Sequence, residues 1–358
     1  MLSAPVLVGR LDPQSPDADA VAHFGDPVKE QRTLETAAGV VDRSHREVLA
    51  LPGEDRLTWL HSLTTQHLTD LAPMTGSELL VLSPHGHVEQ HALLVDDGAT
   101  TWLDTEPGSG AGLLTFLERM RFLMRVEPSD ATADWALLSL AGPQTDEVLV
   151  SLGVGPLFTP DVLAVPGAKF ATGSVPPRPS TVYAAAAVPD FGGWVRRVQG
   201  GADLLVPRAS APDVIAELGV PTVGLWAYEA LRVAARRPRF GFETDHRTLP
   251  AEVGWTAPAV HLEKGCYRGQ ETVSRVHHLG RPPRKLVLLH LDGITTDELP
   301  ERHTPVLAAD GRAVGFVGTA VRHHELGMVA LAVVKQNVAA DAVLRVGEST
   351  AAIDPEGS

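Results

Sequence analysis

The sequence contains very little cysteine. Cys266 is the single cysteine among 358 residues. One thiol excludes an intramolecular disulfide, and it also excludes an iron–sulfur cluster or a zinc site held by several cysteines of one chain. The protein is therefore not itself an ordinary cluster scaffold.

Long apolar runs and an excess of positive charge are also missing. No apolar run approaches about 18 residues, and residues 1–10 lack a basic segment followed by a long apolar core. The chain has 30 Lys and Arg against 44 Asp and Glu, a net charge of −14. Because phosphate neutralisation needs clustered basic residues, nucleic acid is disfavoured as a partner. We expect a cytoplasmic protein with no membrane partner.

The length and a 44% hydrophobic content predict two or three domains with sizeable cores. Residues 1–24, rich in Pro, Asp and Ala, are expected to be a partly disordered segment. Strands and helices in mixed order over residues 25–280 predict an α+β region. After a Gly-Pro linker, residues 284–353 show short strands separated by Gly and Asp turns, which is typical of a small β-barrel.

The cysteine lies in an unusual octapeptide, Lys264–Glu271 (KGCYRGQE). Its glycines permit a sharp turn, while Lys264 and a helix starting near Gly269 would both favour thiolate over thiol at Cys266. This pattern indicates a reactive cysteine. The alternative is a small buried residue in a tight turn before a helix that Glu271 supports.

Histidines supply the other candidate chemistry. His85, His87, Glu89 and His91 recur at every second position, so a strand through them would place all four on one face. Ligands two apart on a strand lie about 6.6–7 Å apart, so at most two would share one ion. We therefore predict no metal site and favour a solvated strand face. The adjacent pairs at residues 277–278 and 323–324 are interpreted as surface.

The octapeptide resembles the signature of the YgfZ family, folate-binding proteins tied to iron–sulfur cluster maintenance and related to the aminomethyltransferase (T-protein) of glycine cleavage. Further segments are similar in the same order, so that the resemblance covers roughly residues 25 to 350. These segments are 51–60 and 82–88 in the first part, 230–241 and 249–252 in the centre, and 315–320 and 329–332 near the end.

The resemblance implies a three-lobed ring, with two α/β subdomains around a folate channel and a C-terminal barrel. It implies tetrahydrofolate or a one-carbon derivative as cofactor and iron–sulfur client proteins as partners. Cys266 and Lys264 correspond to the working thiol and the residue that stabilises its thiolate. The implied folate-binding residues are Arg232, Tyr267, Gln270 and Glu271. For Arg232 the alternative is an ion pair with Glu229, three residues earlier on a predicted helix.

Two departures distinguish the chain from true aminomethyltransferases. Residues 191–197 lack the folate-contacting glutamate of those enzymes, and residues 102–107 align poorly with the loop that carries their catalytic aspartate. Loss of that acid/base group disfavours aminomethyl transfer. We therefore expect a folate-binding protein that supports iron–sulfur cluster assembly or repair through Cys266. The alternatives are a folate-dependent one-carbon transferase or demethylase, and a non-catalytic adaptor.

Overall fold

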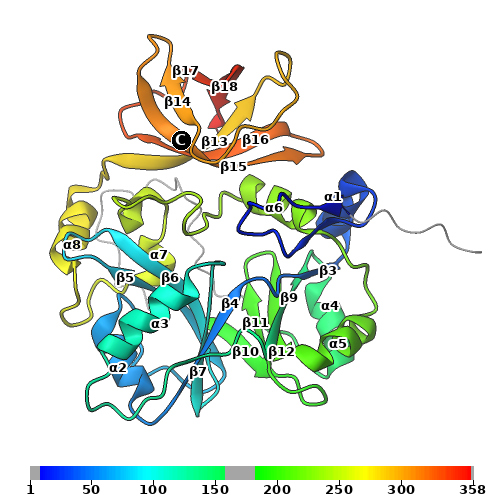
Figure 1. Cartoon of the computed structure of the whole chain (residues 1–358), viewed down its shortest axis with the longest axis vertical. Helices are drawn as coiled ribbons and strands as arrows, with labels where there is room; N and C mark the ends of the chain where they lie inside the picture. The colour runs from blue at the N-terminus through cyan, green and yellow to red at the C-terminus, as the bar shows by residue number, and fades with distance from the viewer. Residues whose placement is uncertain (1–8, 158–181, 356–358) are drawn as a thin grey trace, which may run out of the picture.

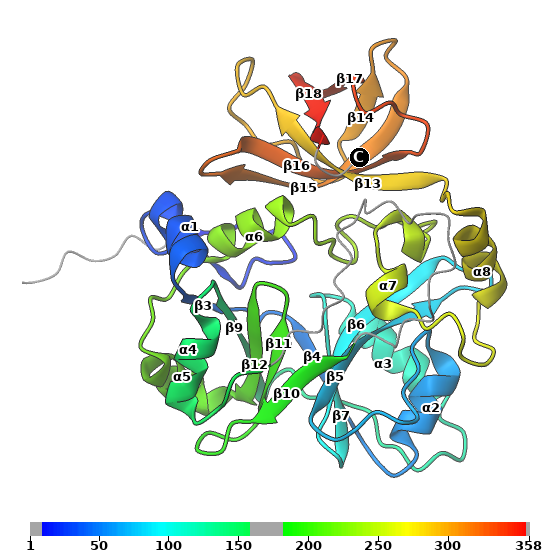
Figure 2. The same cartoon turned by 180° about the vertical axis from the view of Figure 1, so that it is seen from behind.

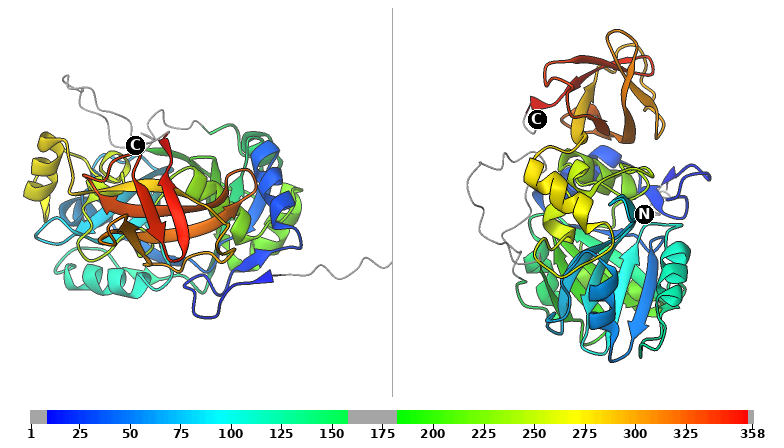
Figure 3. Two further views of the ribbon diagram at one scale, coloured as in Figure 1. Left: turned by 90° about the horizontal axis from the view of Figure 1, so that it is seen from above. Right: turned by 90° about the vertical axis from the view of Figure 1, so that its left-hand side faces the viewer.

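A computed structural model describes residues 9–157 and 182–355. Figures 1 and 2 show two sheet-and-helix lobes side by side, with a third lobe, a barrel, above them. The view from above in Figure 3 shows the barrel lying across both lower lobes. This arrangement confirms the predicted α+β fold with a C-terminal barrel. The expected strand at residues 6–8 and loop at residues 167–179 lie outside the described residues.

One antiparallel sheet of ten strands runs through both lower lobes, and the pairing of β10 with β5 joins its halves. In spatial order the strands are β3 (Gly39–Asp42), β9 (Trp135–Ala141), β12 (Gly201–Pro207), β11 (Trp194–Val198), β10 (Tyr183–Ala187), β5 (Thr75–Leu82), β6 (Val88–Asp96), β7 (Thr100–Thr105), β4 (Glu47–Pro52) and β8 (Ser129–Asp130). Strands β5 and β6 pair with each other as a hairpin.

Each half of the sheet has its own helices (Figure 1) and its own buried cluster of apolar side chains. Helices α2 (Arg56–Leu63) and α3 (Gly110–Arg119) cover the β4–β7 half, where Trp59, Leu103 and Leu117 belong to one buried cluster. Helices α4 (Thr145–Leu149) and α5 (Ala211–Leu218), with the short turns η1 (Val150–Leu152) and η2 (Arg208–Ser210), cover the other half.

A layer of helices separates the lower lobes from the barrel. It contains α1 (Pro27–Thr36), α6 (Leu225–Ala234), η3 (Pro250–Glu252), α7 (Thr256–Ala259) and α8 (Gln270–Leu279). The Asp26 side chain caps α1 by accepting from the Lys29 amide, and Gly280 ends α8 in the left-handed conformation.

Residues 1–24 were expected to be partly disordered, but residues 9–24 have a defined structure. Residues 9–24 carry β1 (Gly9–Arg10) and β2 (Val21–His23), and Asp17, Ala20 and Ala22 are buried. They are held because Asp17 pairs with Arg239, 222 residues later. The remaining expected domain limits stay predictions.

The barrel consists of six antiparallel strands in the order β13 (Arg284–Leu291), β16 (Gly327–Lys335), β15 (Ala313–His323), β14 (Pro305–Ala308), β17 (Val343–Val346) and β18 (Ser349–Ile353). Successive side chains of strand β16 point to opposite faces of the sheet, and both faces are buried. Val329, Leu331 and Val333 pack toward α6 and the lower lobes, while Met328, Ala330, Ala332 and Val334 fill the barrel interior. This strand therefore fixes the barrel onto the rest of the molecule.

Candidate functional site

The turn Lys264–Glu271 connects α7 to α8 and packs on the turn between β5 and β6. Gly269 has a φ of 82°, and a Cβ there would lie 2.6 Å from the carbonyl oxygen of Ser83. A Cβ on Gly86, whose φ is 81°, would lie 2.8 Å from the Cβ of Thr272. Only glycine meets both requirements at these positions, so the two turns are built to lie in contact.

Lys264 is buried and ties this turn to the end of α2. Its Nζ donates hydrogen bonds to the carbonyl oxygens of Thr64 at 2.6 Å and Gln66 at 3.0 Å, and to that of His61. Burial lowers the pKa of Lys264 to about 8, whereas the carbonyls at a helix C-terminus favour its charged form. All three ammonium hydrogens are thus engaged by backbone. These bonds favour a structural role for Lys264 over the expected stabilisation of the Cys266 thiolate.

We expect Lys264→Ala to lower the free energy of unfolding by about 1.5–3 kcal/mol, the range for hydrogen bonds to a charged group. Chemical denaturation measures this loss, with the exposed Lys29→Ala as control. The alkylation rate of the native Cys266 thiol should stay unchanged. Slower alkylation at unchanged stability would restore the thiolate-stabilising role.

The other signature residues take different positions. Cys266 is exposed, which excludes the alternative of a buried structural cysteine. Tyr267 is buried in the core between the lobes, and burial raises its pKa to about 12. Gln270 donates to the Lys264 carbonyl at 3.2 Å, and Glu271 is exposed. The signature therefore forms a rigid turn that presents one thiol to solvent.

Two adjoining cavities lie between the lobes, and none of the signature residues lines either of them. Their volumes are about 230 and 150 Å³, together within the range of about 300–1,000 Å³ usual for small-molecule sites. The walls common to both are formed by Val198, Gln199, Asp203, Tyr228 and Arg237. Six arginines and four carboxylates line the smaller cavity. Positive residues thus predominate among its charged lining residues.

Buried ion pairs hold most of these charges. Arg196 is fully buried and bridges Asp104 at 2.9 Å and Asp203 at 2.8 Å. Arg46 also binds Asp104, at 3.1 Å, and binds Glu106 at 2.7 Å. Although burial alone would raise the pKa of Glu106 and of Asp203, the neighbouring arginines keep both pKa values below the usual range. These carboxylates are ionised and already paired.

Glu78 forms a second polar group on the cavity wall. It lies 3.0 Å from Nε2 of His91 and accepts a hydrogen bond from the Tyr183 hydroxyl. Burial opposes the charge of Glu78, but His91 and Tyr183 lower its pKa. The His91 ring stacks on Trp255 with centroids 4.3 Å apart. Glu78 is therefore also committed to partners within the protein.

Arg232 lines the smaller cavity, but its guanidinium is engaged within the protein. It bonds Glu229 at 2.7 Å, Thr319 of the barrel at 2.6 Å, and the carbonyl oxygen of Arg237. Burial disfavours the cation, but Glu229 and Glu243 raise the pKa of Arg232. The structure thus shows the ion pair between Arg232 and Glu229 that the sequence gave as an alternative. Through Thr319, Arg232 also joins α6 to the barrel.

Arg237 is a cavity-lining cation with spare donors. It lines both cavities and is half-buried; one Nη donates to the Gln199 carbonyl at 2.9 Å, and its buried Nε has no hydrogen-bond partner. No carboxylate among residues 9–157 and 182–355 pairs with it. Its guanidinium lies 5.7 Å from the centroid of the Tyr228 ring. This arrangement suits an anionic ligand with an aromatic portion.

Two expectations about histidines need correction. A bulge in the β5–β6 ladder breaks the alternation, so Glu89 is exposed and pairs with Arg268 while His91 is buried against Glu78. These residues do not share one face. His324 is not at the surface either, since its side chain is only 4% exposed. His277 and His278 are exposed, as expected.

Sequence reasoning missed the arginines that line the cavities or pair with their carboxylates. Arg196, Arg237 and Arg239 lie in segments noted for family resemblance or for departure from it, yet none was identified as a site residue. In strand β11, WVRRV, Arg196 and Arg197 stand between Val195 and Val198, so an arginine pair inside an apolar strand was the available signal.

Comparison with known proteins agrees with this architecture. Residues 21–156 match the family model described as the GCVT N-terminal domain. The fold is also similar to that of the solved glycine cleavage system aminomethyltransferase T from Bartonella henselae, with a TM-score of 0.75 and 18% identity over 98% of this chain and 93% of that one. The domain match thus covers residues 21–156, and the likeness to the solved structure shows that the fold is shared.

Two relatives found by sequence comparison are each 27% identical to this chain. The chain is 27% identical to the aminomethyltransferase of Moorella thermoacetica, over 87% of this chain and 82% of that protein. It is also 27% identical to a chloroplastic protein of Arabidopsis thaliana described as a transferase, over 77% of this chain. The match spans 60% of the Arabidopsis protein.

Within the described residues, no helix is both long and apolar enough to cross a membrane.

Proposed function

We propose that the two adjoining cavities bind a reduced folate, and that the protein acts as a YgfZ-like factor in assembly or repair of iron–sulfur clusters in client enzymes. The observation that carries the folate proposal is Arg237, whose Nε is buried in the cavity wall without a partner. A folate has a negatively charged glutamyl end and an aromatic body. Arg237 would hold the glutamyl carboxylate, and Tyr228 and Trp255 offer aromatic faces.

The folate supplies a one-carbon carrier, and the protein's own residues bind and orient it. The ion pairs around Arg196 and Arg239 keep the cavity walls rigid, so the unpartnered donor of Arg237 is preorganised. Arg232 supports this wall through its bond to the Arg237 carbonyl oxygen. Tyr267, Gln270 and Glu271 line neither cavity, so their contribution is the shape of the turn that carries the thiol.

Cys266 is proposed to act at the surface on a docked client. Its thiol is exposed and lines neither cavity. A rigid glycine-flanked turn presents the sulfur without burying it. An exposed thiol suits contact with a second protein, where it would serve as nucleophile or metal ligand.

We expect Cys266→Ser to fold normally and bind folate, but to fail to restore iron–sulfur enzyme activity in cells that lack the native protein. The exposed Glu263→Gln, in the preceding loop, is the matched control and should restore activity fully. Complete rescue by Cys266→Ser would instead favour the adaptor alternative.

A folate-dependent one-carbon transferase is the second candidate, because relatives of this chain are named aminomethyltransferases. Such transfer needs an available acid or base. Each carboxylate lining the smaller cavity is already paired: Glu78, Asp104, Glu106 and Asp203. We therefore expect no methylenetetrahydrofolate from the aminomethyl-loaded carrier protein of glycine cleavage. Turnover comparable to that of a true aminomethyltransferase would reverse the order of the two candidates.

A further inference from the structure

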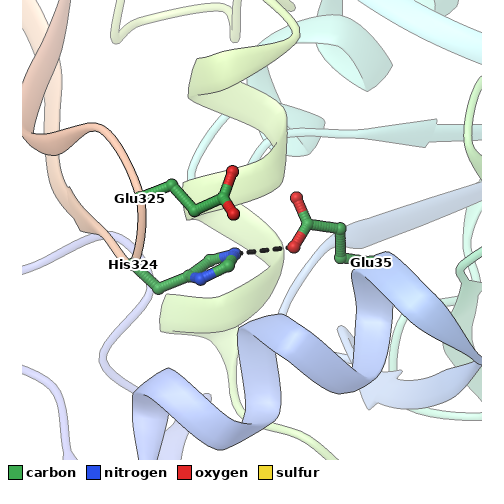
Figure 4. Close-up of side chains that lie close together, drawn as sticks. All are labelled: Glu35, His324 and Glu325. Carbon is green, nitrogen blue, oxygen red and sulfur yellow. Dashed lines mark ion pairs between the residues drawn. The ribbon is translucent and has the colours of Figure 1, made fainter.

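Three potential ligands meet where the barrel touches α1. The turn between β15 and β16 brings His324 and Glu325 beside Glu35 of α1, as Figure 4 shows. One ligand atom from each of the three residues lies within 4.8 Å of those of the other two. The cluster lies apart from the two cavities described above.

His324 points into this cluster with a nitrogen that makes no hydrogen bond. Its side chain is 96% buried, being 4% exposed, and its Nε2 lies 2.8 Å from a carboxylate oxygen of Glu35. That contact lacks the geometry of a hydrogen bond, so the buried Nε2 has no hydrogen-bond partner. A buried polar atom without a partner is costly, and a bound ion would satisfy it.

Neighbouring contacts hold the turn in place. The Gln31 side chain accepts from the His324 amide at 2.9 Å and donates to the Arg322 carbonyl at 2.9 Å. Nδ1 of His323 accepts from the backbone amides of Glu325 and Leu326. The backbone around the cluster is therefore fixed from α1 on one side and by His323 on the other, as outer contacts fix the ligands of metal sites.

We propose that Glu35, His324 and Glu325 bind one divalent cation of the zinc class, independently of the proposed folate function. One imidazole and two carboxylates form a mixed N/O donor set that suits Zn²⁺, whereas Mg²⁺ and Ca²⁺ prefer oxygen ligands alone. Two carboxylates so close together also need more positive charge than one imidazole supplies. Tetrahedral bonds of about 2.1 Å would place the ligand atoms about 3.4 Å apart.

Small movements of the carboxylates complete this geometry. The Glu35 side chain is 43% exposed and Glu325 is exposed, so both are free to turn toward the ion while His324 stays fixed. Water would fill the remaining coordination position. The ion would join the C-terminal barrel to the first helix of the chain, and its binding would stabilise the native state.

The test is a zinc titration of the full-length protein after removal of metal with a chelator. We expect one equivalent of Zn²⁺ to bind and raise the melting temperature. His324→Asn should weaken binding more than about 100-fold, because even outer contacts are worth about 10–100-fold. Glu35→Gln and Glu325→Gln, both at exposed positions, should weaken it without loss of folding. Mg²⁺ should neither compete nor stabilise.

His67→Asn is the control, since the rings of His61, His67 and His261 form a separate histidine group. This variant should bind Zn²⁺ like the wild type. Unchanged binding in His324→Asn and in both glutamine variants would overturn the proposal, as would loss of the bound equivalent in His67→Asn. Absence of binding at submillimolar free Zn²⁺ would also overturn the proposal, and the cluster would then be only an ion pair between His324 and Glu35.

Discussion

Arg196→Ala should lower the free energy of unfolding by about 3–5 kcal/mol, the cost of removing one partner from a buried ion pair. Arg196 is completely buried and is shared by Asp104 and Asp203, which lie on β7 and β12 in the two halves of the sheet. Its loss would leave two buried carboxylates short of positive charge. Because domains are typically stable by about 5–15 kcal/mol, the change is a large fraction of the total.

Chemical denaturation followed by circular dichroism measures this effect. Arg312→Ala is the matched control, because Arg312 forms an exposed pair with Asp310 and exposed pairs contribute about 0–1 kcal/mol. A loss below about 1 kcal/mol in Arg196→Ala would show that the network does not hold the two halves of the sheet together.

Arg237→Ala should weaken tetrahydrofolate binding by about 1.5–3 kcal/mol, the range for hydrogen bonds to a charged group. This corresponds to about 10–150-fold in the dissociation constant. The loss should be confined to affinity, because Arg237 pairs with no carboxylate among the described residues and its buried Nε bonds nothing. Calorimetry under reducing conditions measures it, alongside the melting temperature.

Two further variants test whether the loss of tetrahydrofolate affinity is specific to the Arg237 guanidinium. Arg237→Lys keeps the charge but loses the planar fork of donors, so it should recover only part of the affinity. Arg125→Ala removes an exposed arginine that pairs with Glu54 and Asp55, and it should bind like the wild type. Equal affinity in Arg237→Ala and wild type would remove Arg237 from the site.

Much of the fold was predictable because its signals are local. The glycines around α8 and the short strands of the barrel appear as patterns of neighbouring residues. Strand β18 is the exception, because its sequence, STAAI, is weakly typical of a strand and gains its form by pairing with β13 and β17.

The candidate site was less predictable because its contacts join distant residues. Arg196 and Asp104 are 92 residues apart, and Arg239 and Asp17 are 222 apart. Lys264 binds backbone carbonyls about 200 residues earlier, and no sequence pattern marks a carbonyl as an acceptor. The octapeptide therefore indicated that the turn mattered, while the role of its lysine depended on tertiary structure.

A crystal structure of the full-length protein soaked with tetrahydrofolate tests the central claim most directly. We predict ligand in the cavities lined by Tyr228 and Arg237, with a carboxylate bonded to the Arg237 guanidinium and with the Cys266 thiol out of contact. Empty cavities at saturating ligand, or a folate bound against Cys266, would contradict the account.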